Sequence, residues 1–325
     1  MAKSCVLIIE NRVDASLLAP LQAQSTLCLT VSGGEAVKNL ATYESLALRL
    51  IQEGIGSDCV IVACGGGATL DLAGFLAATY CRGVRLCFIP STLLAMTDAA
   101  IGGKNGLDLH AIKNIIGTIY HPDLVIIDID LLRSLPAVEM QNGLVEMAKH
   151  ALLDNKASCD RFMKALPALK AKNKEALIAE IERSTSIKMR FVSEAILHPE
   201  RRHLLNFGHT IGHAIESLEH FQCSHGQAVA RGILVESYLA KLLSYLPESE
   251  YQYIEALIRA LELPMRLASF PHEQWLQALQ RDKKADQGRP RFVLPREVGR
   301  FVHEEGACVV EVPQEPLFQA IKNFE

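Results

Sequence analysis

The chain has 325 residues, of which 49% are hydrophobic and 22% are charged. This length allows two domains, and the composition is that of a folded globular protein rather than a disordered or fibrous one. The formal net charge is -4 at pH 7, which argues against nucleic acid as a partner because such surfaces need concentrated basic residues. No apolar stretch approaches the length of a membrane span, so no membrane partner is expected.

The cysteines and the N-terminus predict a cytoplasmic protein. Nine cysteines are scattered along the chain and never form C-x-x-C, which is typical of small buried side chains in a reducing compartment. The N-terminus leads into a short apolar run, Cys5–Ile9, with no small-residue cleavage site. We therefore expect no signal peptide.

Residues 1–137 alternate short β-branched runs with stretches long enough for crossover helices, which is typical of a parallel α/β sheet. The expected strands are Cys5–Ile9, Leu27–Val31, Cys59–Ala63, Leu86–Ile89 and Leu124–Ile129. We therefore predict a Rossmann-like domain over residues 1–137.

A glycine-rich turn, Gly65–Gly67, follows the third expected strand and precedes an expected helix over Leu72–Tyr80. Glycines let the backbone approach a pyrophosphate, and a helix N-terminus offers unpaired N–H groups and a favourable dipole. The G-x-G-x-x-G spacing is not matched. The residues thus leave two interpretations open, a dinucleotide or phosphate site and a simple tight turn.

Further polar residues follow the fourth expected strand. They are Ser91 and Thr92, Asp98, Lys104 after two glycines, and Lys113 with Asn114. Glycines beside lysines suit an anionic ligand that lies against the backbone. Because ligands of open α/β sheets bind beyond the carboxyl ends of the strands, we expect a site in the cleft between the two halves.

From Pro136 onward helical periodicity dominates, which predicts a mostly α-helical domain over residues 138–325. A helix containing Glu146 and Lys149 is expected directly after Pro136, and Ile254, Leu257, Ile258 and Leu261 recur at helical spacing. Short extended pieces are expected at Phe292–Leu294 and Cys308–Val312.

The most informative run is Leu205–Glu216, followed by His225. In a helix, His209, His213 and Glu216 fall on one face, and His225 can fold back from the following loop. A zinc-type ion favours imidazole nitrogens with a carboxylate, and Glu146 is a candidate carboxylate. Two histidines four residues apart are also common as packing or surface residues, so the spacing alone leaves both interpretations open.

Together these motifs resemble the dehydroquinate synthase family of sugar-phosphate cyclases. The likeness runs in order over nearly the whole chain, through Ser32–Lys38, Gly65–Gly67, Asp71–Phe75, Tyr80–Gly83, Pro90–Ala95, Gly102–Lys104, Lys113–Asn114, Gly143–Lys149, Leu205–Glu216, His225–Gly226 and Asp282–Lys284. The resemblance implies an N-terminal NAD-binding domain, a helical metal-binding domain, one zinc or cobalt ion and a homodimer. It also implies the shikimate-pathway conversion of 3-deoxy-D-arabino-heptulosonate 7-phosphate, a phosphorylated sugar acid, to 3-dehydroquinate and phosphate.

The resemblance further implies roles for individual residues. The metal ligands would be Glu146, His209 and His225. The NAD-binding residues would be Glu35, Lys38, Gly66, Gly67, Asp71, Ser91, Thr92, Lys104 and Lys113. Catalytic and substrate-binding residues would be Arg82, Asp98, Lys104, Lys113, Asn114, Lys149, Arg202, Asn206, His213, Lys283 and Lys284.

The chain departs from the family pattern at Leu70 and Ile112, which replace glycines, and at Ser91 and Gln227, which replace a threonine and a glutamate. Three alternatives share the layout: a 2-deoxy-scyllo-inosose synthase-like cyclase, a metal-dependent glycerol or alcohol dehydrogenase, and a non-catalytic descendant of such enzymes. The retained His213 favours dehydroquinate synthase over the cyclases that act on sedoheptulose 7-phosphate. The lysines suited to phosphate weigh against the dehydrogenases.

Overall fold

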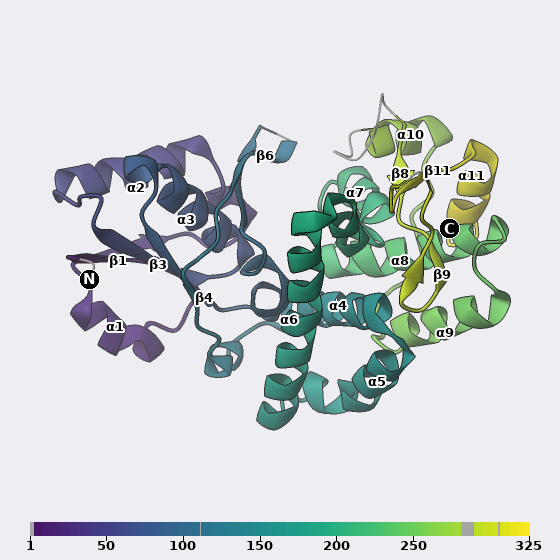
Figure 1. Cartoon of the computed structure of the whole chain (residues 1–325), viewed down its shortest axis with the longest axis horizontal. Helices are drawn as coiled ribbons and strands as arrows, with labels where there is room; N and C mark the ends of the chain where they lie inside the picture. Colours follow the sequence, from purple (N-terminus) through teal and green to yellow (C-terminus); the bar gives the residue numbers. More distant parts are fainter. Residues whose placement is uncertain (1–2, 111, 281–288, 305) are drawn as a thin grey trace. The chain divides into compact units, whose positions relative to one another are not determined.

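The computed structural model describes residues 3–110, 112–280, 289–304 and 306–325. The chain forms two compact units, Met1–Met140 and Gln141–Glu325, and Figure 1 traces the elements of each along the sequence. The functional division expected between residues 137 and 138 stays a prediction.

The first unit is built on a parallel sheet with the strand order β2-β1-β3-β4-β7. Its strands are β1 Ser4–Glu10, β2 Leu27–Val31, β3 Cys59–Gly65, β4 Arg85–Pro90 and β7 Leu124–Val125. Strand β2 pairs with one edge of β1 and β3 pairs with the other. Successive strands are therefore added first on one side of β1 and then on the other. Open α/β sheets bind ligands at such a switch point, and the prediction of a parallel α/β fold is confirmed.

Helices cover both faces of this sheet. They are α1 Ala19–Gln24, α2 Leu40–Gln52 and α3 Gly67–Thr79, and Figure 1 shows α2 and α3 on one face and α1 on the other. Leu50 of α2, Leu72 and Leu76 of α3 and Ile61 of β3 belong to one buried cluster. Burying a side chain of this size stabilises the fold by about 1.5–3 kcal/mol.

Two local expectations for this unit are wrong in extent, and one feature was not foreseen. Helix α3 begins at Gly67, well before Leu72, with Gly65 as the last residue of β3 and Gly66 as the N-cap. Strand β7 ends at Val125 because only two of its residues pair with the neighbouring strand, and the 3-10 helix η5 Ile129–Leu132 follows. An antiparallel hairpin of β5 Lys104–Leu109 and β6 Ile112–Ile119 was not expected at all.

Short helical turns connect the strands of the first unit. They are η1 Ala15–Leu18, η2 Glu35–Val37, η3 Tyr80–Arg82 and η4 Ala95–Ala99. Three of them carry residues expected to bind ligands, namely Glu35, Arg82 and Asp98. The turns therefore place polar side chains between the regular elements of the sheet.

The second unit is mostly helical, as predicted. Its helices, of which the first starts just before the unit boundary, are α4 Ala137–Asp154, α5 Lys156–Lys170, α6 Lys174–Leu197, η6 Pro199–Asn206, α7 His209–Leu218, α8 His225–Leu242, α9 Glu248–Arg259, α10 His272–Gln280 and α11 Gln314–Lys322. Its short strands are β8 Arg291–Phe292, β9 Pro295–Glu297, β10 Arg300–Phe301 and β11 Val310–Glu311, which pair antiparallel as β8 with β11 and β9 with β10. The expected pieces Phe292–Leu294 and Cys308–Val312 are thus shorter and shifted.

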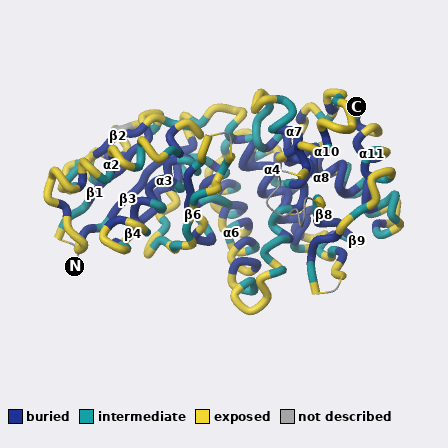
Figure 2. Tube along the Cα trace, turned by 90° about the horizontal axis from the view of Figure 1, so that it is seen from above, coloured by how far each residue is buried: buried dark blue, intermediate teal, exposed yellow. Residues whose placement is uncertain are grey.

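Helix α8 is the centre of this unit, and most of it has the dark blue of buried residues in Figure 2. It packs closely against α7 where two glycines meet. Gly208 has a left-handed backbone (φ +79°), and a Cβ on Gly232 would overlap the carbonyl oxygen of Gly208. Only glycine allows the two backbones to approach so closely.

Within the described residues, no helix is both long and apolar enough to cross a membrane.

Candidate functional site

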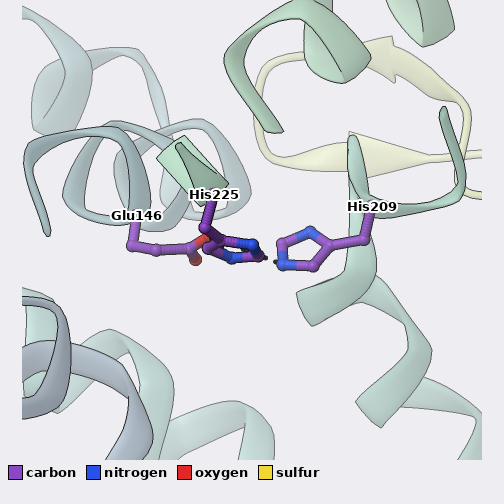
Figure 3. A group of neighbouring side chains, drawn as sticks. All are labelled: Glu146, His209 and His225. Carbon is purple, nitrogen blue, oxygen red and sulfur yellow. Dashed lines mark ion pairs between the residues drawn. The ribbon is translucent and has the colours of Figure 1, made fainter. Parts of the chain in front are cut away.

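Three side chains of the second unit form a candidate metal centre. Glu146 comes from α4, and His209 and His225 are the first residues of α7 and α8. Figure 3 shows them converging from these three helices. The Nε2 atoms of His209 and His225 lie 3.5 and 3.8 Å from Oε1 of Glu146, and one ligand atom from each residue lies within 4.8 Å of the others.

The opposite nitrogen of each histidine ring is bonded within the protein. Nδ1 of His209 lies 3.1 Å from the carbonyl oxygen of Phe207, and Nδ1 of His225 lies 3.3 Å from Oε1 of Glu216. A ring that donates from Nδ1 presents the Nε2 lone pair, which is the form that binds metal. Both rings are therefore oriented as ligands toward one point.

Burial and the neighbouring charges act differently on the two imidazoles. Burial, reinforced by the nearby Lys149 ammonium, holds the pKa of His209 well below its usual value. For His225 burial acts in the same direction, but hydrogen bonds to Glu146 and Glu216 outweigh it and raise the pKa to about 10. Zinc and cobalt take such N and O donors, and three protein ligands leave a position open for substrate. The donor set therefore fits the expected ion.

Lys149 supports the carboxylate of this centre. It follows Glu146 by one helical turn, and both side chains are only 1–2% exposed. Its Nζ forms an ion pair with Oε2 of Glu146 and donates a 2.7 Å hydrogen bond to the carbonyl oxygen of Leu205. One carboxylate oxygen thus faces a protein cation, and the other faces the two imidazoles.

The expectation that His225 lies in a loop is wrong. Ser224 caps α8 and forms a capping box with Gln227, so His225 is fixed at the first helical position. Gly226 N donates 2.9 Å to Oδ1 of Asn142, which ties this helix start to α4. A capping box accepts either glutamine or glutamate at this position, so Gln227, a departure from the family pattern, keeps the local geometry.

The other expected residues of this unit lie near the same elements. His213 is exposed one turn after His209, and the two rings contact edge to face with centroids 5.5 Å apart. Arg202 and Asn206 lie in η6, which leads directly into α7. Lys283 and Lys284 lie outside the described residues. The roles of all five stay predictions.

In the first unit, Lys38 gathers several of the expected NAD-binding residues. Its side chain is 3% exposed, and Nζ lies 2.8 Å from Oδ2 of Asp71, 3.3 Å from Glu35 and 3.9 Å from Asp108, with a further hydrogen bond to Asn114. Burial disfavours the ammonium, but the carboxylates outweigh it and raise the pKa of Lys38. Burial raises the pKa of Asp71 to about 6 despite this ion pair.

The glycine-rich turn also differs from expectation. Gly66 is the N-cap of α3, and its N–H, which was expected to be unpaired, donates 2.8 Å to Oε2 of Glu10. The hydroxyl of Thr69 donates to the same oxygen at 3.0 Å. A carboxylate is favourable at a helix N-terminus, and Glu10 reaches it because β1 and β3 are neighbours in the sheet.

The remaining expected residues of this unit occupy turns and strand ends. Ser91 is buried and Thr92 partly buried after β4, whereas Lys104 and Arg82 are exposed. Arg82 has φ +68° and lies between Cys81 (φ +50°) and Gly83 (φ +121°). Non-glycine residues seldom adopt this region, and such strain often marks functional positions. Their roles in binding NAD or substrate stay predictions.

Three carboxylates escaped the sequence reasoning. Glu10 and Asp108 were not singled out, and Glu216 was noted for its helical spacing but given no role. The one usable signal was for Glu10, because a carboxylate directly after a buried strand points to the ligand-binding edge of the sheet.

Two family models match consecutive parts of this chain. Residues 28–142 match the family model described as 3-dehydroquinate synthase N-terminal, and residues 143–285 match the one described as 3-dehydroquinate synthase C-terminal. The chain belongs to the 3-dehydroquinate synthase family. The 3-dehydroquinate synthase of Syntrophotalea carbinolica is 36% identical over 297 residues, which cover 91% of this chain and 81% of that protein.

Solved structures agree with this membership. A 2-deoxy-scyllo-inosose synthase complexed with carbaglucose-6-phosphate, NAD+ and Co2+ matches with a TM-score of 0.89 and 26% identity, over 99% of this chain and 90% of that one. A 2-epi-5-epi-valiolone synthase from Streptomyces hygroscopicus with NAD+ and Zn2+ bound matches with a TM-score of 0.87 and 25% identity, over 99% and 91%. Structural relatives therefore contain NAD+ together with zinc or cobalt.

Proposed function

We propose that this protein is a 3-dehydroquinate synthase, a phosphate-eliminating carbon–oxygen lyase. It converts 3-deoxy-D-arabino-heptulosonate 7-phosphate to 3-dehydroquinate and phosphate in the shikimate pathway. One observation carries the proposal: in a chain whose two halves match this family, Glu146, His209 and His225 converge as a set of metal donors. We further propose that the cofactors are NAD and one zinc or cobalt ion.

When bound, NAD would supply reversible hydride transfer, and the ion, held by Glu146, His209 and His225, would supply polarisation of a substrate hydroxyl. The protein residues hold the ion and orient its ligands. Glu146 provides negative charge, and Lys149 fixes the plane of that carboxylate through Oε2. We propose that the exposed imidazole of His213, one turn from His209, takes up or releases a proton.

The substrate carries a phosphate and a carboxylate, so it needs several cations and polar groups. We propose that these are Arg82, Asp98, Lys104, Lys113, Asn114, Arg202, Asn206, Lys283 and Lys284. For NAD we propose Glu35, Lys38, Gly66, Gly67, Asp71, Ser91, Thr92, Lys104 and Lys113. The Lys38 contacts support part of this second set, because they bring Glu35 and Asp71 to one point.

We also propose a homodimer in the cytoplasm, with no nucleic-acid or membrane partner. The nine cysteines are all free thiols, which suits a reducing compartment. Size-exclusion chromatography with light scattering tests the dimer.

One assay tests the proposed reaction. The protein is loaded with Zn2+ or Co2+ and incubated with NAD and the heptulosonate phosphate, while phosphate and nicotinamide absorbance are followed together. We expect one phosphate for each product molecule and no accumulation of NADH. Accumulation of NADH with turnover would instead identify a dehydrogenase.

The structural match to a 2-deoxy-scyllo-inosose synthase favours a second candidate substrate class. Hexose 6-phosphate in the same assay tests it directly. Phosphate release from the hexose phosphate but not from the heptulosonate phosphate would replace the first assignment with this one.

A further inference from the structure

The carboxylate of Glu216 lies against one ligand of the candidate metal centre. Glu216 is in α7, two turns after His209, and is 6% exposed. Its Oε1 lies 3.3 Å from Nδ1 of His225. The proposed reaction gives this buried acid no role.

The contact determines which nitrogen of His225 can bind an ion. A carboxylate accepts hydrogen bonds, so Nδ1 keeps its proton, and the proton that a binding ion displaces is the one on Nε2. That Nε2 is the atom 3.8 Å from Oε1 of Glu146. Glu216 and Glu146 therefore lie on opposite sides of one imidazole ring, and an ion bound by Nε2 would lie on the Glu146 side.

The turn between α7 and α8 brings His225 back to Glu216. The N–H of Phe221 donates 2.7 Å to the carbonyl oxygen of Glu216. His220 and Phe221 both have left-handed backbones, with φ of +51° and +58°. Such conformations cost about 1–3 kcal/mol each and persist where the surroundings fix them. The capping box of Ser224 and Gln227 then starts α8 at His225.

The two histidine ligands differ in what holds them. His209 donates to the carbonyl oxygen of Phe207, a neutral acceptor, whereas His225 contacts a carboxylate. A charged acceptor orients the ring more strongly and raises the basicity of the opposite nitrogen. The carboxylate thus affects the strength of the metal bond as well as its direction.

We propose that Glu216 is a positioning residue of the metal centre, which fixes the tautomer and orientation of His225 for binding the ion through Nε2. This inference rests on the proposed function, because it assumes that Glu146, His209 and His225 hold the metal.

Glu216→Gln tests the inference, since it keeps the size of the side chain, removes its charge and adds an N–H donor that favours the wrong tautomer. Co2+ is the probe, and its dissociation constant is measured on the purified full-length protein by competition with a chromophoric chelator. We expect the affinity to fall by about 10- to 100-fold. We also expect the visible absorption spectrum of bound Co2+ to change, which a merely structural role would not cause.

Glu219→Gln is the matched control. Glu219 is the C-cap of α7, three residues after Glu216, and accepts a 2.8 Å hydrogen bond from Arg231 rather than from a ligand. We expect this variant to bind Co2+ within about twofold of the unmodified protein. Glu216→Asp keeps the charge but shortens the side chain by one methylene, and it provides the same affinity test if Glu216→Gln does not fold.

The outcomes separate this inference from the proposed function. A folded Glu216→Gln variant with unchanged Co2+ affinity and spectrum would overturn the positioning role, as would an equal loss in Glu219→Gln. Retention of Co2+ by His209→Ala would instead overturn the metal centre itself. Lack of phosphate release by the metal-loaded protein would overturn the reaction and leave the affinity result standing.

Discussion

Each unit contains a group of titratable side chains around a buried charge, Lys38 in the first and Glu146 in the second, and the two groups are built differently. In the first unit, the ammonium of Lys38 is surrounded by the carboxylates of Glu35, Asp71 and Asp108. In the second, Oε1 of Glu146 faces two imidazole Nε2 atoms. The protein's own ammonium lies at the centre of the first group, whereas in the second the Lys149 ammonium pairs with the opposite carboxylate oxygen and leaves two imidazoles for the proposed ion. The two groups are therefore distinguished by which atoms face the buried charge.

The largest effect is expected from a substitution in the second group, the candidate metal centre. His209→Ala removes one of the three proposed metal ligands, so we expect the ion to be lost. A catalytic metal contributes several kcal/mol to transition-state stabilisation, and we expect turnover to fall by about a thousandfold or more. NAD affinity, measured by fluorescence titration, should change by less than about twofold. A variant with undiminished phosphate release would refute the ligand role.

Removing the ion without changing the chain should reproduce this loss. Dialysis against a strong chelator should abolish phosphate release, and added Zn2+ or Co2+ should restore it. Because a bound ion stabilises the state that holds it by mass action, the thermal midpoint should also fall on chelation and recover with metal. Full activity in chelated protein, with metal content checked by elemental analysis, would contradict the proposal that the second group needs a bound ion.

Lys38→Met tests the first group, where the cation belongs to the chain. The substitution leaves Asp71 and its neighbours without their buried partner, and such losses cost about 3–5 kcal/mol. Urea unfolding of the metal-free protein measures the change. The double variant Lys38→Met, Asp71→Asn should recover part of the stability. If the second substitution instead adds to the loss, Lys38 does not stabilise the first group by pairing with Asp71.

The smallest effect is expected for an exposed pair in the same unit. The carboxylate of Glu53 lies 3.0 Å from the guanidinium of Arg49, and both side chains are about half exposed. Surface pairs one helical turn apart contribute about 0.3–0.5 kcal/mol, so Glu53→Gln should barely shift the urea midpoint. A loss as large as that of Lys38→Met would show that burial is not what separates these pairs.

The sequence predicted the parts of the molecule that depend on local pattern. Alternating β-branched runs located the parallel strands, and helical spacing placed His209 and His213 on α7. The convergence of Glu146 with His209 and His225 came from the family resemblance, because these residues lie on three helices and no local pattern joins them. Long-range partners such as Glu10 and Gly66 depend on the order of strands in the sheet, which strand patterns alone leave open.

Details that depend on backbone conformation were not predicted from the sequence, for a related reason. The capping box that puts His225 at a helix start needs Ser224 and Gln227 to exchange hydrogen bonds, and their residue types also suit a loop. Likewise, the left-handed residues at His220 and Phe221 leave no compositional mark, since neither is glycine or asparagine.

The tight crossing of Gly208 and Gly232 has a consequence for engineering. These residues set the gap between the two helices that begin with His209 and His225, although neither glycine supplies a side chain to the ion. A methyl group at residue 232 would push the helices apart and spread the two rings. Substitution at residue 232 is therefore expected to change which ion radius the proposed site prefers, although this residue is not one of the ligands.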